Sequence, residues 1–93
     1  MNARKVIDLM DDLAIFVYVV QSGGFSSAAQ ILDVTPSAVS KQISRLEKNL
    51  GVKLLIRNTR TMRLTDVGQE ILLQAQSMLQ AAQAVQQVAN NSM

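Results

Sequence analysis

Hydrophobic residues recur with the period of an α-helix in the early part of the chain. The first apolar stripe consists of Ile15, Phe16, Val19 and Val20. We expect this helix to begin near Asp11 and Asp12, because carboxylates stabilise a helix N-terminus, and to end at the glycine pair 23–24. The β-branched residues of the stripe leave a strand as the alternative. Residues 1–9 are expected to form a flexible extension.

A shorter helix is expected over residues 28–32, where three apolar residues form an inward face: Ala28, Ile31 and Leu32. Either Ser26 or Ser27 can cap it, because a serine hydroxyl accepts hydrogen bonds from the free N–H groups of a helix start. Residues 33–34 then make a tight connection to the next element.

A third helix is expected to begin at Thr35 and Pro36. Threonine is a good N-cap, and proline suits the first helical position, where its missing N–H costs no hydrogen bond. Gly51 ends the helix. Its apolar stripe consists of Val39, Ile43, Leu46 and Leu50. Its other side carries serines and bases, with Arg45 at the flank: Ser37, Ser40, Lys41, Ser44 and Lys48.

Two short apolar runs, at residues 54–56 and 62–64, flank Asn58 and Thr59. This pattern predicts a small β-hairpin, although its turn lacks glycine. The hairpin would carry three arginines: Arg57, Arg60 and Arg63.

A long final helix is expected over residues 65–90, capped by Thr65 and followed by a tail, 91–93. Its heptad-like seam consists of Ile71, Ala75, Met78, Ala82, Val85 and Ala89, with Leu72 and Leu79 beside it. At 1.5 Å per residue the helix would be roughly 35 Å long, more than so small a domain can cover. We therefore expect it to need a partner surface. The alternatives are a helix that folds back wholly on its own domain, or a Gln/Ala-rich end that is partly disordered past Val88.

The composition excludes several kinds of chemistry. The chain has 93 residues, of which 48% are hydrophobic, and it contains no cysteine and no histidine. Disulfides, zinc sites of the Cys/His type and histidine-based catalysis are therefore excluded, and we expect no cofactor or metal. The acids form no obvious catalytic pair, so an enzyme is the most remote interpretation.

Charge and hydropathy indicate the kind of binding partner and the cellular localisation of the protein. Seven basic residues lie between Lys41 and Arg63, against the single acid Glu47, which favours a polyanionic partner over a merely solvated charged face. The apolar run 13–20 is too short to span a bilayer, and the acids before it are untypical of an export signal. We expect a cytoplasmic protein with no membrane partner.

Two short helices joined by a tight turn, the second polar on its outer face, form a helix-turn-helix pattern. The major groove of B-DNA admits such a helix, and small side chains near its N-terminus allow close approach. The three aromatic residues are better suited to packing than to stacking on single strands, so duplex DNA is the expected partner. The candidate DNA-binding residues are Ser26, Ser27, Thr35, Pro36, Ser37, Ala38, Ser40, Lys41, Ser44, Arg45, Arg57, Thr59, Arg60 and Arg63. We interpret Lys48 and Lys53 as solvated charges.

The run FSSAAQILDVTPSAVSKQISRLEKNLGVKLLIRNTRTMRLTDVGQ, residues 25–69, resembles the N-terminal domain of LysR-type transcriptional regulators. A less specific resemblance extends from residue 13 to about residue 79. It implies a mainly α fold, namely a winged helix-turn-helix domain (three helices plus a short hairpin wing) over residues 10–64, followed by a linker helix. Residues 36–50 match the recognition helix, and Arg57 and Arg60 match the two recurrent arginines of the wing. Leu55 departs from the phenylalanine often found there.

The resemblance further implies a homodimer formed through the C-terminal helix, with a higher oligomer as an option in the full-length parent. The residues expected to dimerise are Ile71, Leu72, Ala75, Met78, Leu79, Ala82 and Val85. The effector-binding domain of the family is absent, so we expect a DNA-binding fragment or a short relative, with no small-molecule effector bound to this chain. The resulting hypothesis is sequence-specific binding to two half-sites of double-stranded DNA in bacterial transcription regulation. The alternative is a protein-interaction module whose long C-terminal helix is the functional surface.

Overall fold

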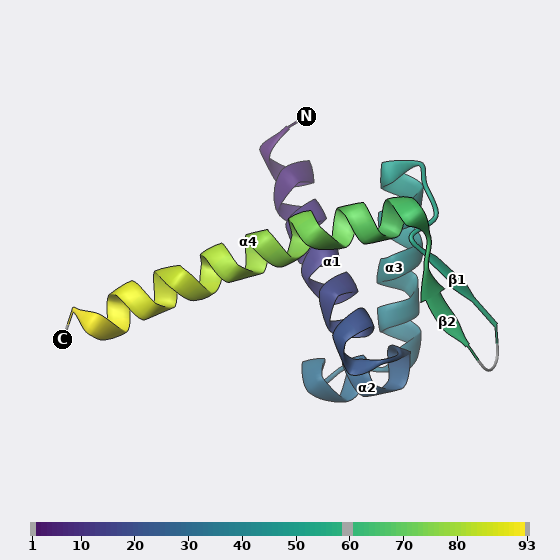
Figure 1. Ribbon diagram of the computed structural model, residues 1–93, viewed down its shortest axis with the longest axis horizontal. Helices are drawn as coiled ribbons and strands as arrows, with labels where there is room; N and C mark the ends of the chain where they lie inside the picture. Colours follow the sequence, from purple (N-terminus) through teal and green to yellow (C-terminus); the bar gives the residue numbers. More distant parts are fainter. Residues whose placement is uncertain (1, 59–60, 93) are drawn as a thin grey trace.

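The computed structural model describes residues 2–58 and 61–92. Within these residues the secondary structure is helical except for one β-hairpin. The elements are α1 (Ala3–Ser22), α2 (Phe25–Leu32), α3 (Pro36–Leu50), β1 (Leu55–Arg57), β2 (Met62–Leu64) and α4 (Asp66–Asn91). Figure 1 shows α1, α2 and α3 gathered into one bundle, the hairpin at its edge, and α4 crossing α1 and extending far beyond it. This architecture confirms the predicted winged helix-turn-helix fold with a long final helix.

Helix α1 begins eight residues earlier than the sequence analysis predicted, at Ala3 instead of Asp11. Its N-cap is Asn2, whose Oδ1 accepts a hydrogen bond from the backbone N–H of Lys5 at 2.8 Å. Residues 3–9, expected to be a flexible extension, are the first turns of this helix, because the cap is followed by residues that favour helices. Helix α1 ends as predicted at Gly23, which has φ 89°.

Helix α2 also begins earlier than predicted, at Phe25, and the expected serine cap is wrong. Gly24 is the N-cap residue and makes no side-chain hydrogen bond to the helix. Ser26 and Ser27 lie inside the first turn, where Ser27 Oγ donates to the carbonyl oxygen of Ser22 at 3.0 Å. The tight connection to α3 is confirmed: Asp33 adopts a left-handed conformation with φ 57°.

The predicted ends of α3 are confirmed. The Thr35 Oγ1 atom accepts a hydrogen bond from the backbone N–H of Ala38 at 3.1 Å, and Pro36 occupies the first helical position. Gly51 ends the helix with φ 72°. The buried side of α3 consists of Val39, Ile43 and Leu46, all fully buried.

The predicted hairpin is also confirmed, as an antiparallel pair in which Leu55 faces Leu64 and Arg57 faces Met62. The turn is partly described: Asn58 Oδ1 accepts a hydrogen bond from the backbone N–H of Thr61 at 2.8 Å. Thr59 and Arg60 lie outside the described residues.

One hydrophobic core lies between α1, α2, α3 and the base of the hairpin. Its buried members are Phe16, Val19, Ala28, Ala29, Val39, Ile43, Leu46, Leu54 and Leu55. Burial of this apolar surface is the main stabilising contribution to so small a fold. Within the described parts of the chain, no helix has the length and apolar character needed to cross a membrane, and no cluster of metal-binding side chains occurs.

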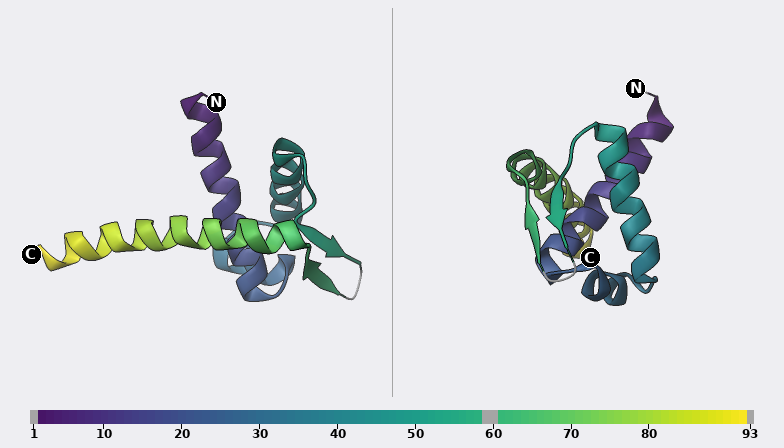
Figure 2. Two further views of the ribbon diagram at one scale, coloured as in Figure 1. Left: turned by 45° about the horizontal axis from the view of Figure 1, so that its top comes forward. Right: turned by 90° about the vertical axis from the view of Figure 1, so that its right-hand side faces the viewer.

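The seam of α4 divides into two parts. Ile71 and Leu72 pack against the core, and Ala75 is fully buried. These residues were predicted to dimerise, but they contact their own domain because α4 lies across α1 (Figure 2). From residue 80 to residue 92 every position is exposed, including Ala82 and Val85. The exposed part of the seam therefore lies in the second half of the helix.

Candidate nucleic-acid interface

The first turns of α3 present small and polar side chains to solvent. Thr35, Pro36, Ser37 and Lys41 are exposed, and Ala38 and Ser40 are half-buried between them. The N-terminus of α3 adds a favourable site for a phosphate, because free backbone N–H groups and the helix dipole both attract anions. This surface carries only small side chains apart from Lys41, which gives it a positive charge, and both features suit a helix that enters a groove of duplex DNA.

Arg45, at the flank of α3, is held by a buried carboxylate of α1. Its Nε donates to Asp12 Oδ2 at 3.0 Å and its Nη2 donates to Asp12 Oδ1 at 2.7 Å. The Asp12 side chain is 1% exposed, whereas that of Arg45 is 53% exposed. Hydrogen bonding to Asp12, together with its negative charge, raises the pKa of the Arg45 guanidinium above its ordinary value. Arg45 therefore carries a charge that is already paired.

The role of Asp12 was missed in the sequence, where it was interpreted as a helix-start residue. A signal was present: Asp12 lies four residues before Phe16, on the side of α1 that the apolar stripe buries. A carboxylate in that position needs a cationic partner.

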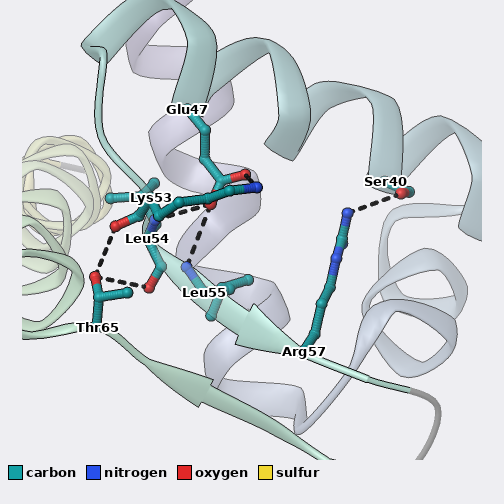
Figure 3. Close-up of polar contacts among 7 residues, drawn as sticks. All are labelled: Ser40, Glu47, Lys53, Leu54, Leu55, Arg57 and Thr65. Carbon is teal, nitrogen blue, oxygen red and sulfur yellow. Dashed lines mark hydrogen bonds and ion pairs between the residues drawn. The ribbon is translucent and has the colours of Figure 1, made fainter.

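Glu47 joins α3 to the base of the hairpin (Figure 3). Its Oε2 accepts hydrogen bonds from the backbone N–H groups of Leu54, at 2.8 Å, and Leu55, at 3.3 Å. Its Oε1 lies 3.7 Å from Lys53 Nζ, whose side chain is 79% exposed. The single acid of the basic region therefore positions the wing relative to α3, and sequence reasoning did not find this role.

Arg57 lies back over the helices. Its guanidinium carbon is 4.4 Å from the centroid of the Phe25 ring, and its Nη2 donates to Ser40 Oγ at 3.5 Å. The wing arginine and the recognition-helix serine are thus brought together, as the close-up in Figure 3 shows. Arg63, on the neighbouring strand, is exposed.

The remaining predicted DNA-binding residues fall into three groups. Ser44 is exposed on the outer side of α3, and Ser26 is exposed in α2. Ser27 directs its hydroxyl toward the end of α1, so its side chain is engaged within the fold. The predicted contacts of Thr59 and Arg60 concern residues outside those that the structure describes.

The chain is similar to known regulators over most of its length. A family model of bacterial regulatory helix-turn-helix proteins of the lysR family matches residues 10–69. The probable HTH-type transcriptional regulator LtrA of Klebsiella pneumoniae is 51% identical over 76 residues, which make up 82% of this chain and 25% of that protein. The regulator CrgA of Neisseria meningitidis is 46% identical over the same shares of the two chains. This chain thus spans about a quarter of the length of these relatives.

Solved structures agree with the sequence relatives. A CbnR DBD–DNA complex has a TM-score of 0.77 and 30% identity, with 89% of this chain and 95% of that chain covered. A complex of the BenM DBD with benA site 1 DNA has a TM-score of 0.79 and 29% identity, with 88% and 92% covered. The family match covers more than half of the chain and coincides with the helices and hairpin that build the candidate interface. The chain therefore belongs to the lysR family of bacterial regulatory helix-turn-helix proteins, and its fold is the DNA-binding domain of such regulators.

Proposed function

We propose that the chain binds double-stranded DNA in a sequence-specific manner, with α3 in the major groove and the hairpin beside it. The observation that carries this proposal is the exposed first half of α3, where small polar side chains and Lys41 form the outer face of a capped helix. The CbnR and BenM structures, solved with DNA, support it by the likeness of their fold.

Within this proposal the residues divide between base edges and phosphates. Four residues at the start of α3 would contact bases: Pro36, Ser37, Ser40 and Lys41. The wing arginines would contact the backbone or the minor groove, where cations are attracted irrespective of sequence. Arg45 would contribute little to the salt dependence, because Asp12 already neutralises its charge.

We further propose that two copies bind together through the free half of α4. Val85 and Val88 are 69% and 67% exposed, and this part of the helix carries no charged side chain. An isolated uncharged helix of this length is marginally stable in water, so a second copy would stabilise it. Two recognition helices would then read half-sites about 34 Å apart on bacterial DNA in the cytoplasm. The second candidate function is that of a protein-interaction module, because the same exposed valines could bind another protein.

The decisive experiment is fluorescence anisotropy with a duplex selected by the protein from a random pool and with a scrambled version, across a salt series. Tighter binding to the selected duplex, two chains per duplex and a steep salt dependence are expected. Equal binding to both duplexes would reduce the proposal to non-specific electrostatic attraction. An absence of binding at low salt, with self-association retained, would favour the protein-interaction module.

A further inference from the structure

Arg57 sits at the junction of the hairpin, α2 and α3. Its backbone belongs to β1, its guanidinium stacks 4.4 Å from the Phe25 ring centroid in α2, and its Nη2 reaches Ser40 Oγ in α3 at 3.5 Å. A cation over an aromatic face is attracted by the ring, which restricts the motion of the side chain. Arg57 is therefore oriented toward the recognition helix before any ligand arrives (Figure 3).

The Ser40 hydroxyl is used differently from those of Ser77 in α4 and Ser92, the C-cap residue that follows α4. Ser77 Oγ donates to the carbonyl oxygen of Leu73 at 3.1 Å, and Ser92 Oγ donates to that of Val88 at 2.9 Å. This bond to the preceding turn is one of the ways in which a serine in or beside a helix uses its proton. Ser40 instead accepts from Arg57, and its hydroxyl donates to no other group in the described chain.

The chemistry of the two groups biases what Ser40 can offer. A guanidinium has donors only, so the serine oxygen is the acceptor in this contact; one of its two lone pairs is engaged, and its O–H proton stays free. Ser40 lies one turn after Pro36 and is half-buried next to the exposed Lys41. Its unused proton is therefore available to an external hydrogen-bond acceptor.

We propose that Arg57 is a positioning residue that makes Ser40 a hydrogen-bond donor toward DNA. Ser40 then presents its proton to an acceptor, either a base-edge atom such as guanine O6 or N7 or thymine O4, or a phosphate oxygen. With one lone pair engaged by Arg57, it is a poorer acceptor for the amino group of cytosine at the same place. The inference rests on the proposed DNA-binding function. It adds that Ser40 acts as a hydrogen-bond donor toward DNA and that Arg57 is the residue that orients it.

A double-mutant cycle tests the coupling, with affinities for the pool-selected duplex measured by fluorescence anisotropy. Ser40→Ala is expected to weaken binding about fivefold in the wild-type background, the worth of one hydrogen bond, and less than about twofold in an Arg57→Ala background. Arg63→Ala is the matched control, since it also removes one wing charge, and in that background Ser40→Ala should again cost about fivefold. Thermal unfolding of each variant checks that the fold is kept.

The same Ser40→Ala loss in the Arg57→Ala background as in the wild type would overturn the inference while leaving DNA binding intact. If the wild-type chain does not distinguish the selected duplex from its scrambled version, the proposed function itself fails.

Two further experiments identify the acceptor on DNA. In the first, each base pair of the selected duplex is substituted in turn. If the wild type distinguishes the base pairs at one position, and Ser40→Ala and Arg57→Ala both lose this preference, the acceptor is a base-edge atom at that position. A single methylphosphonate that removes the Ser40→Ala effect indicates a phosphate. A Ser40→Ala loss that neither experiment alters would mean that Ser40 donates to no DNA acceptor and would overturn the inference.

Discussion

Asp12 and Arg45 form a bidentate ion pair that joins α1 to α3, with N···O distances of 3.0 and 2.7 Å. Only the carboxylate is buried, so the two partners are unequal. Removing the arginine leaves a buried charge without a partner, whereas removing the carboxylate leaves a cation that water can solvate. The structure therefore predicts different costs for the two substitutions.

Arg45→Ala is expected to lower the free energy of unfolding by about 3 kcal/mol, because Asp12 is left buried and unpaired. Asp12→Asn should cost less, about 1 to 2 kcal/mol, for the lost charge-assisted hydrogen bonds. Urea unfolding measures both. In the double variant the Arg45→Ala cost should largely disappear, and simple addition of the two costs would contradict the pairing. Asp11→Asn, at the exposed neighbouring position, is the control.

Glu47→Ala is expected to free the wing base from α3, since the N–H groups of Leu54 and Leu55 lose their acceptor. The measurement is amide hydrogen exchange by NMR, in which both amides should exchange faster than in the wild type. Lys53→Ala removes only the exposed ion pair and should leave both amides protected. Unchanged protection after Glu47→Ala would show that the carboxylate does not hold the wing.

Gly68→Ala is expected to destabilise the fold by roughly 1 to 3 kcal/mol, the cost of overpacking. A Cβ at this position would overlap the backbone carbonyl oxygen of Leu54, which cannot rotate away. In an exposed helix the same change would be stabilising, so the sign is informative. Ser77→Ala, on the exposed side of α4, provides the comparison and should be nearly neutral in a thermal melt. A higher melting temperature for Gly68→Ala would contradict the close approach.

Val85→Lys is expected to weaken self-association at least tenfold without unfolding the domain, because it places a charge on the free seam of α4. Sedimentation equilibrium gives the association constant, and circular dichroism checks the helix content. Gln87→Lys adds the same charge on the opposite side of the helix and should leave association unchanged. Equal effects of the two lysines would indicate that net charge, and no particular face, governs the assembly.

Lys41→Ala is expected to cost about 1 to 3 kcal/mol of binding free energy on the selected duplex if the lysine reads a base. Lys48→Ala, further along the same helix, should change affinity little. Anisotropy titrations with selected and scrambled duplexes separate the possibilities. Equal losses on both duplexes would make Lys41 a phosphate contact.

The predictable parts of this fold were those determined by neighbouring residues. The start of α3 was predicted because the cap and the first-turn proline lie next to each other, and its end because Gly51 favours a left-handed backbone. The start of α1 was not predicted correctly. The sequence analysis placed it at Asp11 and Asp12, whereas Asn2 caps the helix. The wing was predicted as a hairpin from its two apolar runs.

The contacts between distant segments could not be predicted in this way. The pairing of Asp12 with Arg45 spans 33 residues, and it depends on how α1 crosses α3. The position of Arg57 over Phe25 depends on the wing folding back on α2. The division of the α4 seam into a part packed on the domain and an exposed part depends on where α4 extends past α1. The sequence therefore located α3 and its polar outer face, whereas the residues that position this helix could be identified only from the fold.

The junction between the hairpin and α4 gives the final helix the properties of a lever. One residue, Thr65, separates β2 from α4, and it is pinned by hydrogen bonds from its Oγ1 to Lys53 O, at 2.7 Å, and from its N–H to Leu54 O, at 3.0 Å. The first half of α4 packs against α1, so only the end from residue 80 to residue 91 extends beyond that contact, for about 18 Å at 1.5 Å per residue. A force that tilts this end therefore acts first on the contact between α4 and α1 and then, through Thr65, on the base of the hairpin.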